Sequence, residues 1–99
     1  MSFVSITTLR MISETESLQH VTDLMQRKYF PGLLALGAKH SMLVDVDLDR
    51  FAIVTVYPSR EVRDGAIAHV SALRIEGAEE FGAKMMDAYG GELLASSEA

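Results

Sequence analysis

The segment that most constrains the fold of this chain is residues 50–61. Residues 51–57 are aromatic or β-branched apart from Ala52, and this composition is typical of a β-strand. Ser59 is a preferred helix N-cap residue, and Glu61 places a negative charge in the first turn, where it complements the helix dipole. The segment therefore predicts a strand that runs directly into a helix.

Both faces of this predicted strand are apolar. One face carries Phe51, Ile53 and Tyr57, and the other carries Ala52, Val54 and Val56. Antiparallel sheets normally present one polar face to water, and monomers rarely expose a large apolar patch. We expect helices to cover one face and a second copy of the chain to cover the other. The alternative is that residues 31–39 and the C-terminal segment fold over the second face.

A capping pattern indicates where the first helix begins. Ser13 and Glu16 fit a capping box, so we expect the helix to begin at Ser13. Apolar residues then recur at spacings of three and four and should form its buried face: Leu18, Val21, Met25 and Tyr29. Pro31-Gly32 should end or kink this helix.

Alternating apolar residues predict two further strands, at residues 3–11 and 40–46, and residues 47–50 are a connection short enough for a hairpin. The C-terminal part predicts, in order, a helix at residues 60–75, a break at Gly77, a shorter helix at 78–88, a turn at Gly90-Gly91 and a short strand at 92–95. The order is β-α-β-β-α-β with one additional helix. It indicates a single α+β domain at residues 1–99, with a ferredoxin-like four-stranded antiparallel sheet and helices on one face. We expect it to dimerise through the sheet into an α+β barrel.

Charge and composition exclude several classes of partner. The net charge of −5 argues against binding to nucleic acid or to an anionic membrane surface. Cysteine is absent, which excludes disulfides, thiolate metal sites and cysteine nucleophiles. We find neither a signal-peptide pattern nor an apolar run of the roughly 20 residues that a membrane helix needs, and therefore expect a cytoplasmic protein.

Three short motifs resemble the dimeric α+β barrel superfamily, and most of all its antibiotic biosynthesis monooxygenase branch. They are Pro31-Gly32 after the first helix, Arg50-Phe51 at the start of the third strand, and Tyr57-Pro58-Ser59-Arg60-Glu61 at the strand–helix junction. The resemblance implies a homodimer with a pocket between sheet and helices in each subunit. It also implies a cofactor-independent enzyme that acts on a small aromatic or quinone-type molecule.

The chain departs from the better-defined members of that branch. Haem-degrading members use an asparagine, a tryptophan and a ligand histidine, whereas this chain has no asparagine or tryptophan and no histidine near Ile75-Glu76. Haem degradation is therefore not expected. Oxygenases of polycyclic phenols rely on tryptophan, asparagine and arginine, and Tyr57 replaces the tryptophan that is common at the strand–helix junction.

His69 and Tyr57 are the two candidate catalytic residues. We expect Val62, Ala66, His69 and Leu73 to form the inward stripe of the second helix, with Arg60, Arg63, Asp64, Ser71 and Arg74 on its outer face. An inward histidine could act as a general base, and the alternative is a structural histidine. The hydroxyl of Tyr57 could bind a phenol or carbonyl, and the alternative is a rim residue with its ring in the core and its oxygen in water.

Two functions remain open at this point. The first is a cofactor-independent monooxygenase-like enzyme in which Met25 and Val62 help to wall the substrate pocket. The second is a non-catalytic dimeric module that binds a small ligand or a protein. The spacing of the three histidines suggests no metal site, and we expect no cofactor. A pocket smaller than roughly 300 Å³ would favour the second function.

Overall fold

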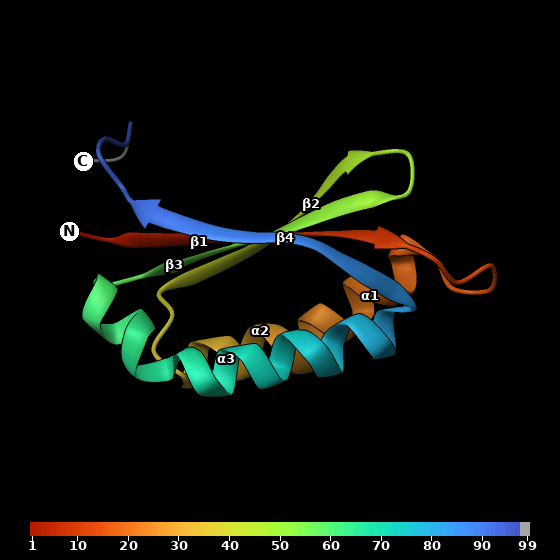
Figure 1. The fold of residues 1–99 in the computed structure, drawn as a ribbon, viewed down its shortest axis with the longest axis horizontal. Helices are drawn as coiled ribbons and strands as arrows, with labels where there is room; N and C mark the ends of the chain where they lie inside the picture. Colours follow the sequence, from red (N-terminus) through yellow and green to blue (C-terminus); the bar gives the residue numbers. More distant parts are fainter. Residues whose placement is uncertain (98–99) are drawn as a thin grey trace.

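The computed structural model describes residues 1–97 and has one sheet with all of its helices on one side (Figure 1). The sheet is antiparallel, with strand order β2-β3-β1-β4. In chain order the elements are β1 (Phe3–Met11), α1 (Leu18–Leu24), the π-helical turn η1 (Met25–Tyr29), α2 (Phe30–Ala35), β2 (His40–Asp47), β3 (Arg50–Tyr57), α3 (Arg60–Phe81) and β4 (Ala83–Glu92). The predicted ferredoxin-like α+β fold is therefore confirmed.

The junction between β3 and α3 is built as the sequence predicts. Ser59 has an extended backbone, and its Oγ accepts a hydrogen bond of 3.2 Å from the backbone N–H of Val62. Glu61 lies in the first turn of the helix. The helix consequently begins at Arg60, and Tyr57 at the end of β3 is held directly beneath its first turns.

The first helix begins later than the capping pattern predicts. Ser13 Oγ accepts hydrogen bonds of 3.2 Å from the N–H groups of Thr15 and Glu16, but these close a local turn. The backbone N–H groups of Ile12 and Ser13 both donate to the carbonyl of Gly82 at 2.9 Å, which ties this segment to the end of α3. These two hydrogen bonds hold Ile12 and Ser13 against the end of α3. The helix α1 therefore begins after them, at Leu18.

The helix also continues past Pro31-Gly32 instead of ending there. In η1 the N–H of Phe30 donates to the carbonyl of Met25, one residue further back than in an α-helix. Pro31 then lies in the first turn of α2, where a missing N–H costs little. The expected end or kink at Pro31-Gly32 is therefore wrong, and the irregular part of this helical segment is the π-helical turn before it, between two short α-helices.

The C-terminal quarter differs from the prediction in its secondary structure. No break occurs at Gly77, no third helix forms at 78–88, and residues 83–92 are the strand β4. Gly77 is buried inside α3, where a Cβ would lie 3.2 Å from the Phe81 ring. Gly90 lies in β4, where a Cβ would approach the Phe3 ring to 2.7 Å. These glycines serve close packing, and the helix ends instead at Gly82, which has φ 69°.

The sheet has two apolar faces, and the helices cover one of them. Phe3, Leu9, Phe51 and Tyr57 are buried beneath the helices. On the other face the hydrophobic side chains Met42, Val44 and Tyr89 are 37%, 43% and 59% exposed. The helix α2 lies on the helical side with the others, so residues 31–39 do not fold over the open face (Figure 1). Among residues 1–97, no helix has the length and apolar character to cross a membrane.

Candidate functional site

A cavity of about 40 Å³ lies between the inner face of the sheet and the helices. Its wall is mostly apolar and includes Met25 of η1 and Met85 of β4. Its polar lining comes from three elements: Ser5 and Thr7 of β1, Thr55 and Tyr57 of β3, and Arg74 of α3. We refer to it below as the Tyr57–Arg74 cavity.

The strands place hydroxyl groups on their buried face. Ser5, Thr7 and Thr55 are only 4–5% exposed, at inward positions where the strand pattern otherwise supplies apolar side chains. Ser5 lies opposite Thr55 in the β1–β3 register, so both line the same part of the cavity. Thr55 Oγ1 is hydrogen bonded to Ser41 Oγ at 2.9 Å. A buried polar group is costly unless it has a partner, so this cluster marks the cavity as more than a packing defect.

Tyr57 is fully buried, with no exposed surface. Within residues 1–97, its hydroxyl is the buried side-chain polar atom for which no protein group supplies a hydrogen bond. Burial raises the pKa of Tyr57, and the charges of Arg74 and Arg63 act in the opposite direction. The hydroxyl is therefore protonated at neutral pH and free to donate a hydrogen bond into the cavity. The alternative of a rim tyrosine with its oxygen in water is wrong.

Arg74 is half-buried and bonded to the sheet. Its Nη2 donates a hydrogen bond of 2.8 Å to Ser5 Oγ. In the part of the chain that the structure describes, none of its ion pairs within 4 Å involves Arg74. Burial lowers the pKa of Arg74, the nearby Tyr57 raises it, and Arg63 lowers it further. An arginine stays protonated even so, and its positive charge faces the cavity without an acidic side chain opposite it.

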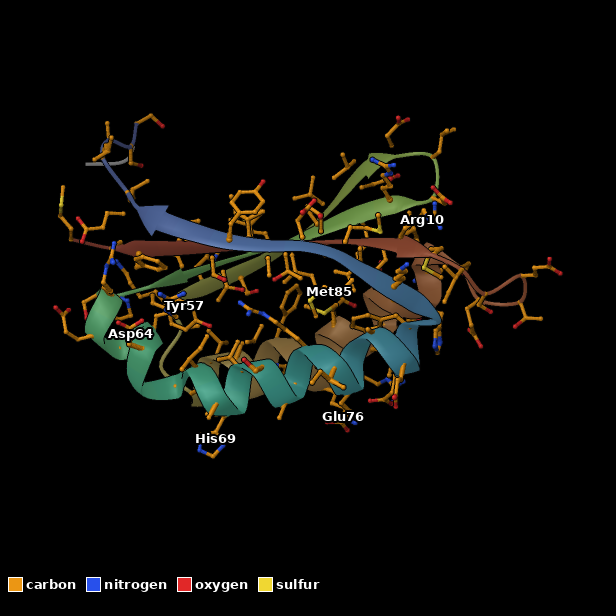
Figure 2. The ribbon with its side chains drawn as sticks, viewed as in Figure 1. Arg10, Tyr57, Asp64, His69, Glu76 and Met85 are labelled. Carbon is orange, nitrogen blue, oxygen red and sulfur yellow. The ribbon has the colours of Figure 1, made fainter. Side chains whose placement is uncertain are left out.

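The predicted inward face of α3 is correct for Val62, Ala66 and Leu73 and wrong for His69. The buried positions of α3 are Ala66, Val70, Gly77 and Phe81. His69 is exposed and points away from the sheet (Figure 2), so the expectation that it faces inward is wrong. Arg74, which was expected on the outer face, lines the cavity instead. The spacing of three and four is also satisfied by Val70, which follows His69 and is the buried residue.

The two predicted wall residues have different positions. Met25 lines the cavity as expected. Val62 packs beside Tyr57 and Ala66 in the apolar cluster under the start of α3 and is not part of the cavity wall. Sequence reasoning missed four residues of the site: Ser5, Thr7, Thr55 and Arg74. The three strand residues could have been found, because they are polar residues on the same face of strands whose other residues are mostly apolar.

A polar network fixes one wall of the cavity. The ring of Tyr29 lines the cavity, and its hydroxyl donates a hydrogen bond to Glu80 of α3. Lys28 donates to Glu80 at 2.6 Å and to Glu76 at 2.7 Å. The hydrogen bonds from Lys28 and then Tyr29 lower the pKa of Glu80. This network fastens η1 to α3 and orients the Tyr29 ring.

The chemistry available in the cavity is hydrogen-bond donation. Its described lining contains hydroxyls, one guanidinium and thioethers, and no imidazole or carboxylate. Residues 1–97 contain no cluster of three His, Asp or Glu side chains arranged to hold a metal ion. The cavity can therefore bind and stabilise an electron-rich group, but its own side chains offer no strong base.

Comparison with known proteins assigns the fold. No family model matches the chain, and no curated protein matches it. A dimeric ferredoxin-like protein from an uncultured marine organism has a TM-score of 0.68 at 18% identity, over 97% of each chain. An antibiotic biosynthesis monooxygenase-like protein of Chloroflexus aurantiacus has a TM-score of 0.61 at 13% identity, over 97% of this chain and 96% of that one. A NIPSNAP family protein of Agrobacterium tumefaciens has a TM-score of 0.60 at 11% identity, over 100% and 97%.

These neighbours place the chain in a structural class. It has a ferredoxin-like fold like that of these neighbours, and the predicted resemblance is confirmed at the level of the fold. At these identities the likeness concerns the fold alone, and fold does not determine activity. Function has to be argued from the cavity.

Proposed function

We propose that this protein is a dimeric binding module that holds a small polar ligand, or the polar end of a larger one, in the Tyr57–Arg74 cavity. The observation that carries the proposal is the hydroxyl of Tyr57, which is buried without a partner and faces the same space as the guanidinium of Arg74. Leaving a buried donor unpaired costs about 1–3 kcal/mol. A ligand that accepts a hydrogen bond from Tyr57 would recover this cost.

The size of the cavity favours binding over the enzymatic alternative. Its volume is about 40 Å³, well below the roughly 300 Å³ at the lower end of ordinary ligand pockets. This space suits a group of a few atoms, whereas a complete aromatic ring would not fit. The exposed position of His69 also removes the general base that the enzymatic hypothesis required.

A second copy of the chain is the proposed cover for the open sheet face. Met42 and Val44 of β2 and Tyr89 of β4 are exposed there, and the apolar surface between them continues through Ile6 of β1 and Val54 of β3. A twofold contact would bury this face against itself. The marine neighbour is described as dimeric, which supports the same arrangement here.

Cofactor-independent oxidation of a phenol or quinol is the second candidate. It is favoured by the two donors, Tyr57 and Arg74, because both could stabilise the negative charge of a phenolate oxygen at the mouth of the cavity. The monooxygenase-like neighbour supports it at the level of the fold. Oxygen consumption with hydroquinone, measured for the wild type and Tyr57→Phe, tests it. Equal rates in the two proteins would remove Tyr57 from any such reaction.

Methyl NMR tests the binding proposal. Met25 and Met85 line the cavity, whereas Met1 and Met42 are exposed and serve as internal references. A panel of small molecules (acetate, acetamide, methanol, phenol and hydroquinone) would be titrated into the wild type, Tyr57→Phe and Tyr89→Phe. We expect saturable shifts at Met25 and Met85, weakened about tenfold by Tyr57→Phe and unchanged by Tyr89→Phe. The absence of saturable shifts for every molecule would contradict the proposal.

A further inference from the structure

The uncompensated charge of Arg74 narrows the class of ligand. Its guanidinium has several N–H donors, and one of them is used, in the bond to Ser5 Oγ. None of the ion pairs formed by residues 1–97 includes it. Taking a cation out of water is costly unless an opposite charge accompanies it. A neutral ligand would leave this charge unmatched, and an anionic ligand would match it.

Arg63, in the first turn of the same helix, α3, shows the contrast. Arg63 Nε donates to Asp64 at 2.8 Å, and its guanidinium stacks over the Phe3 ring at 4.3 Å. The charge of Arg63 is therefore compensated within the protein. Arg74 lies further along the same helix and faces hydroxyl groups where an acidic side chain could have stood.

The donors around the cavity converge from opposite sides. Arg74 comes from α3 and Tyr57 from β3, and both line one space of about 40 Å³. A planar guanidinium matches the two oxygens of a carboxylate, and a phenolic O–H donates readily to a carboxylate oxygen. A carboxylate carries one negative charge, which equals the single positive charge of Arg74. Phosphate carries between one and two negative charges near neutral pH, so one arginine does not fully neutralise it. The apolar remainder of the wall, including Met25 and Met85, suits a short hydrocarbon chain.

We infer that the Tyr57–Arg74 cavity binds the ionised carboxylate of a small organic acid, with Arg74 as its counter-charge and Tyr57 as its second donor. This inference rests on the proposed binding function and specifies its ligand class. A carboxylate with a chain of one to a few carbons fits the cavity, and a longer acid would extend through the mouth. The ligand is recognised by its charge, so a neutral molecule of the same shape is rejected.

Acetate and acetamide form the matched pair of probes, because they have nearly the same shape and differ in charge. Both would be titrated into the wild type at neutral pH, with the Arg74 Nε–H and the methyls of Met25 and Met85 followed by NMR. We expect acetate to produce saturable shifts at all three groups and acetamide to bind at least about tenfold more weakly. Inorganic phosphate at the same ionic strength is the third probe.

Arg74→Gln and Arg27→Gln are the matched variants, since each removes one positive charge and Arg27 is exposed on η1. We expect Arg74→Gln to lose the preference for acetate, Arg74→Lys to retain part of it, and Arg27→Gln to behave as the wild type. The comparison of acetate with acetamide in the wild type decides the inference even if Arg74→Gln does not fold. Equal or tighter binding of acetamide, or saturable binding of phosphate in place of acetate, overturns the inference and leaves the binding function standing. Binding of none of the three probes overturns the inference, and it overturns the binding function as well if methanol, phenol and hydroquinone also fail to bind.

Discussion

Arg74 Nη2 and Ser5 Oγ are joined by a hydrogen bond of 2.8 Å that connects α3 to the inner face of β1. The two residues are far apart in the chain, and their contact places a cation against the buried surface of the sheet. Ser5 is 4% exposed, so water does not readily compete for this bond. The helix and the sheet thus hold the guanidinium in a fixed position at the cavity.

Removal of the Tyr57 hydroxyl should stabilise the protein. Because this hydroxyl is buried without a partner, Tyr57→Phe should raise the free energy of unfolding by about 1 kcal/mol. Tyr29→Phe is the matched control, since the Tyr29 hydroxyl donates to Glu80. We expect this second variant to lose about 1 kcal/mol. Urea denaturation measures both, and a destabilised Tyr57→Phe variant would show that the hydroxyl has a partner in the folded protein.

Two glycines in α3 should respond oppositely to alanine. A Cβ at Gly65 meets no atom within 4 Å, so Gly65→Ala should stabilise the helix by about 0.5–1 kcal/mol. A Cβ at Gly77 would lie 3.2 Å from Phe81 and 3.4 Å from Tyr29. The Phe81 ring makes edge contacts with the rings of Tyr29 and Phe51, which restrict its movement away from an added methyl group. Gly77→Ala should therefore be at least about 1 kcal/mol less stable than Gly65→Ala by thermal or urea unfolding; equal stabilities would refute the packing role of Gly77.

The hydrogen bonds to Glu80 should make the free energy of unfolding decrease as the pH falls into the acid range. Lys28 and Tyr29 lower the pKa of Glu80 below its ordinary value of 4.5, so the ionised carboxylate favours the folded state. Its contribution is complete above pH 4.5 and is lost as the pH falls through the lower folded-state pKa. Glu80→Gln should therefore show a flatter loss of stability on acidification than the wild type. Glu79→Gln, at an exposed neighbouring position, should keep the wild-type slope in urea midpoints measured from pH 6 to pH 3.

The open sheet face should control the oligomeric state. Val44 is 43% exposed on that face, and Ile75 is 63% exposed on the helical side. Val44→Asp places a charge in the proposed dimer contact, so it should halve the mass measured by sedimentation equilibrium. Ile75→Asp makes the same kind of change away from the contact and should leave the mass at twice that of one chain. A wild-type protein that stays monomeric at high concentration would contradict the dimer.

The first three strands were predicted more accurately from the sequence than the helices and β4. The two faces of β3 were grouped correctly, because side chains alternate along any strand, but which face lies under the helices was not predicted, because both faces are apolar. The end of α3 was not predicted correctly, because Gly77 and Gly90 signal a break or a turn when read locally. Their real role is to let the rings of Phe81 and Phe3 approach, and this is a contact between residues that only the tertiary structure brings together.

The candidate site shows the same limit. Tyr57 was identified because it ends the most distinctive strand, and Met25 because it continues an apolar helical face. Arg74 was assigned to the solvent side because a charged residue is rarely buried, and His69 was assigned inward by the same pattern shifted around the helix. In the structure Arg74 lines the cavity and His69 is exposed. Functional positions often depart in this way from the usual pattern of apolar residues inside and charged residues outside.

A crystal structure of the protein grown or soaked in acetate tests the central claim most directly. The account predicts a carboxylate in the Tyr57–Arg74 cavity, with its oxygens within hydrogen-bonding distance of the Arg74 guanidinium and the Tyr57 hydroxyl. The same site should be without acetate in Arg74→Gln crystals prepared in the same way. Acetate found only on the protein surface, with the Arg74 side chain turned out of the cavity, would contradict it.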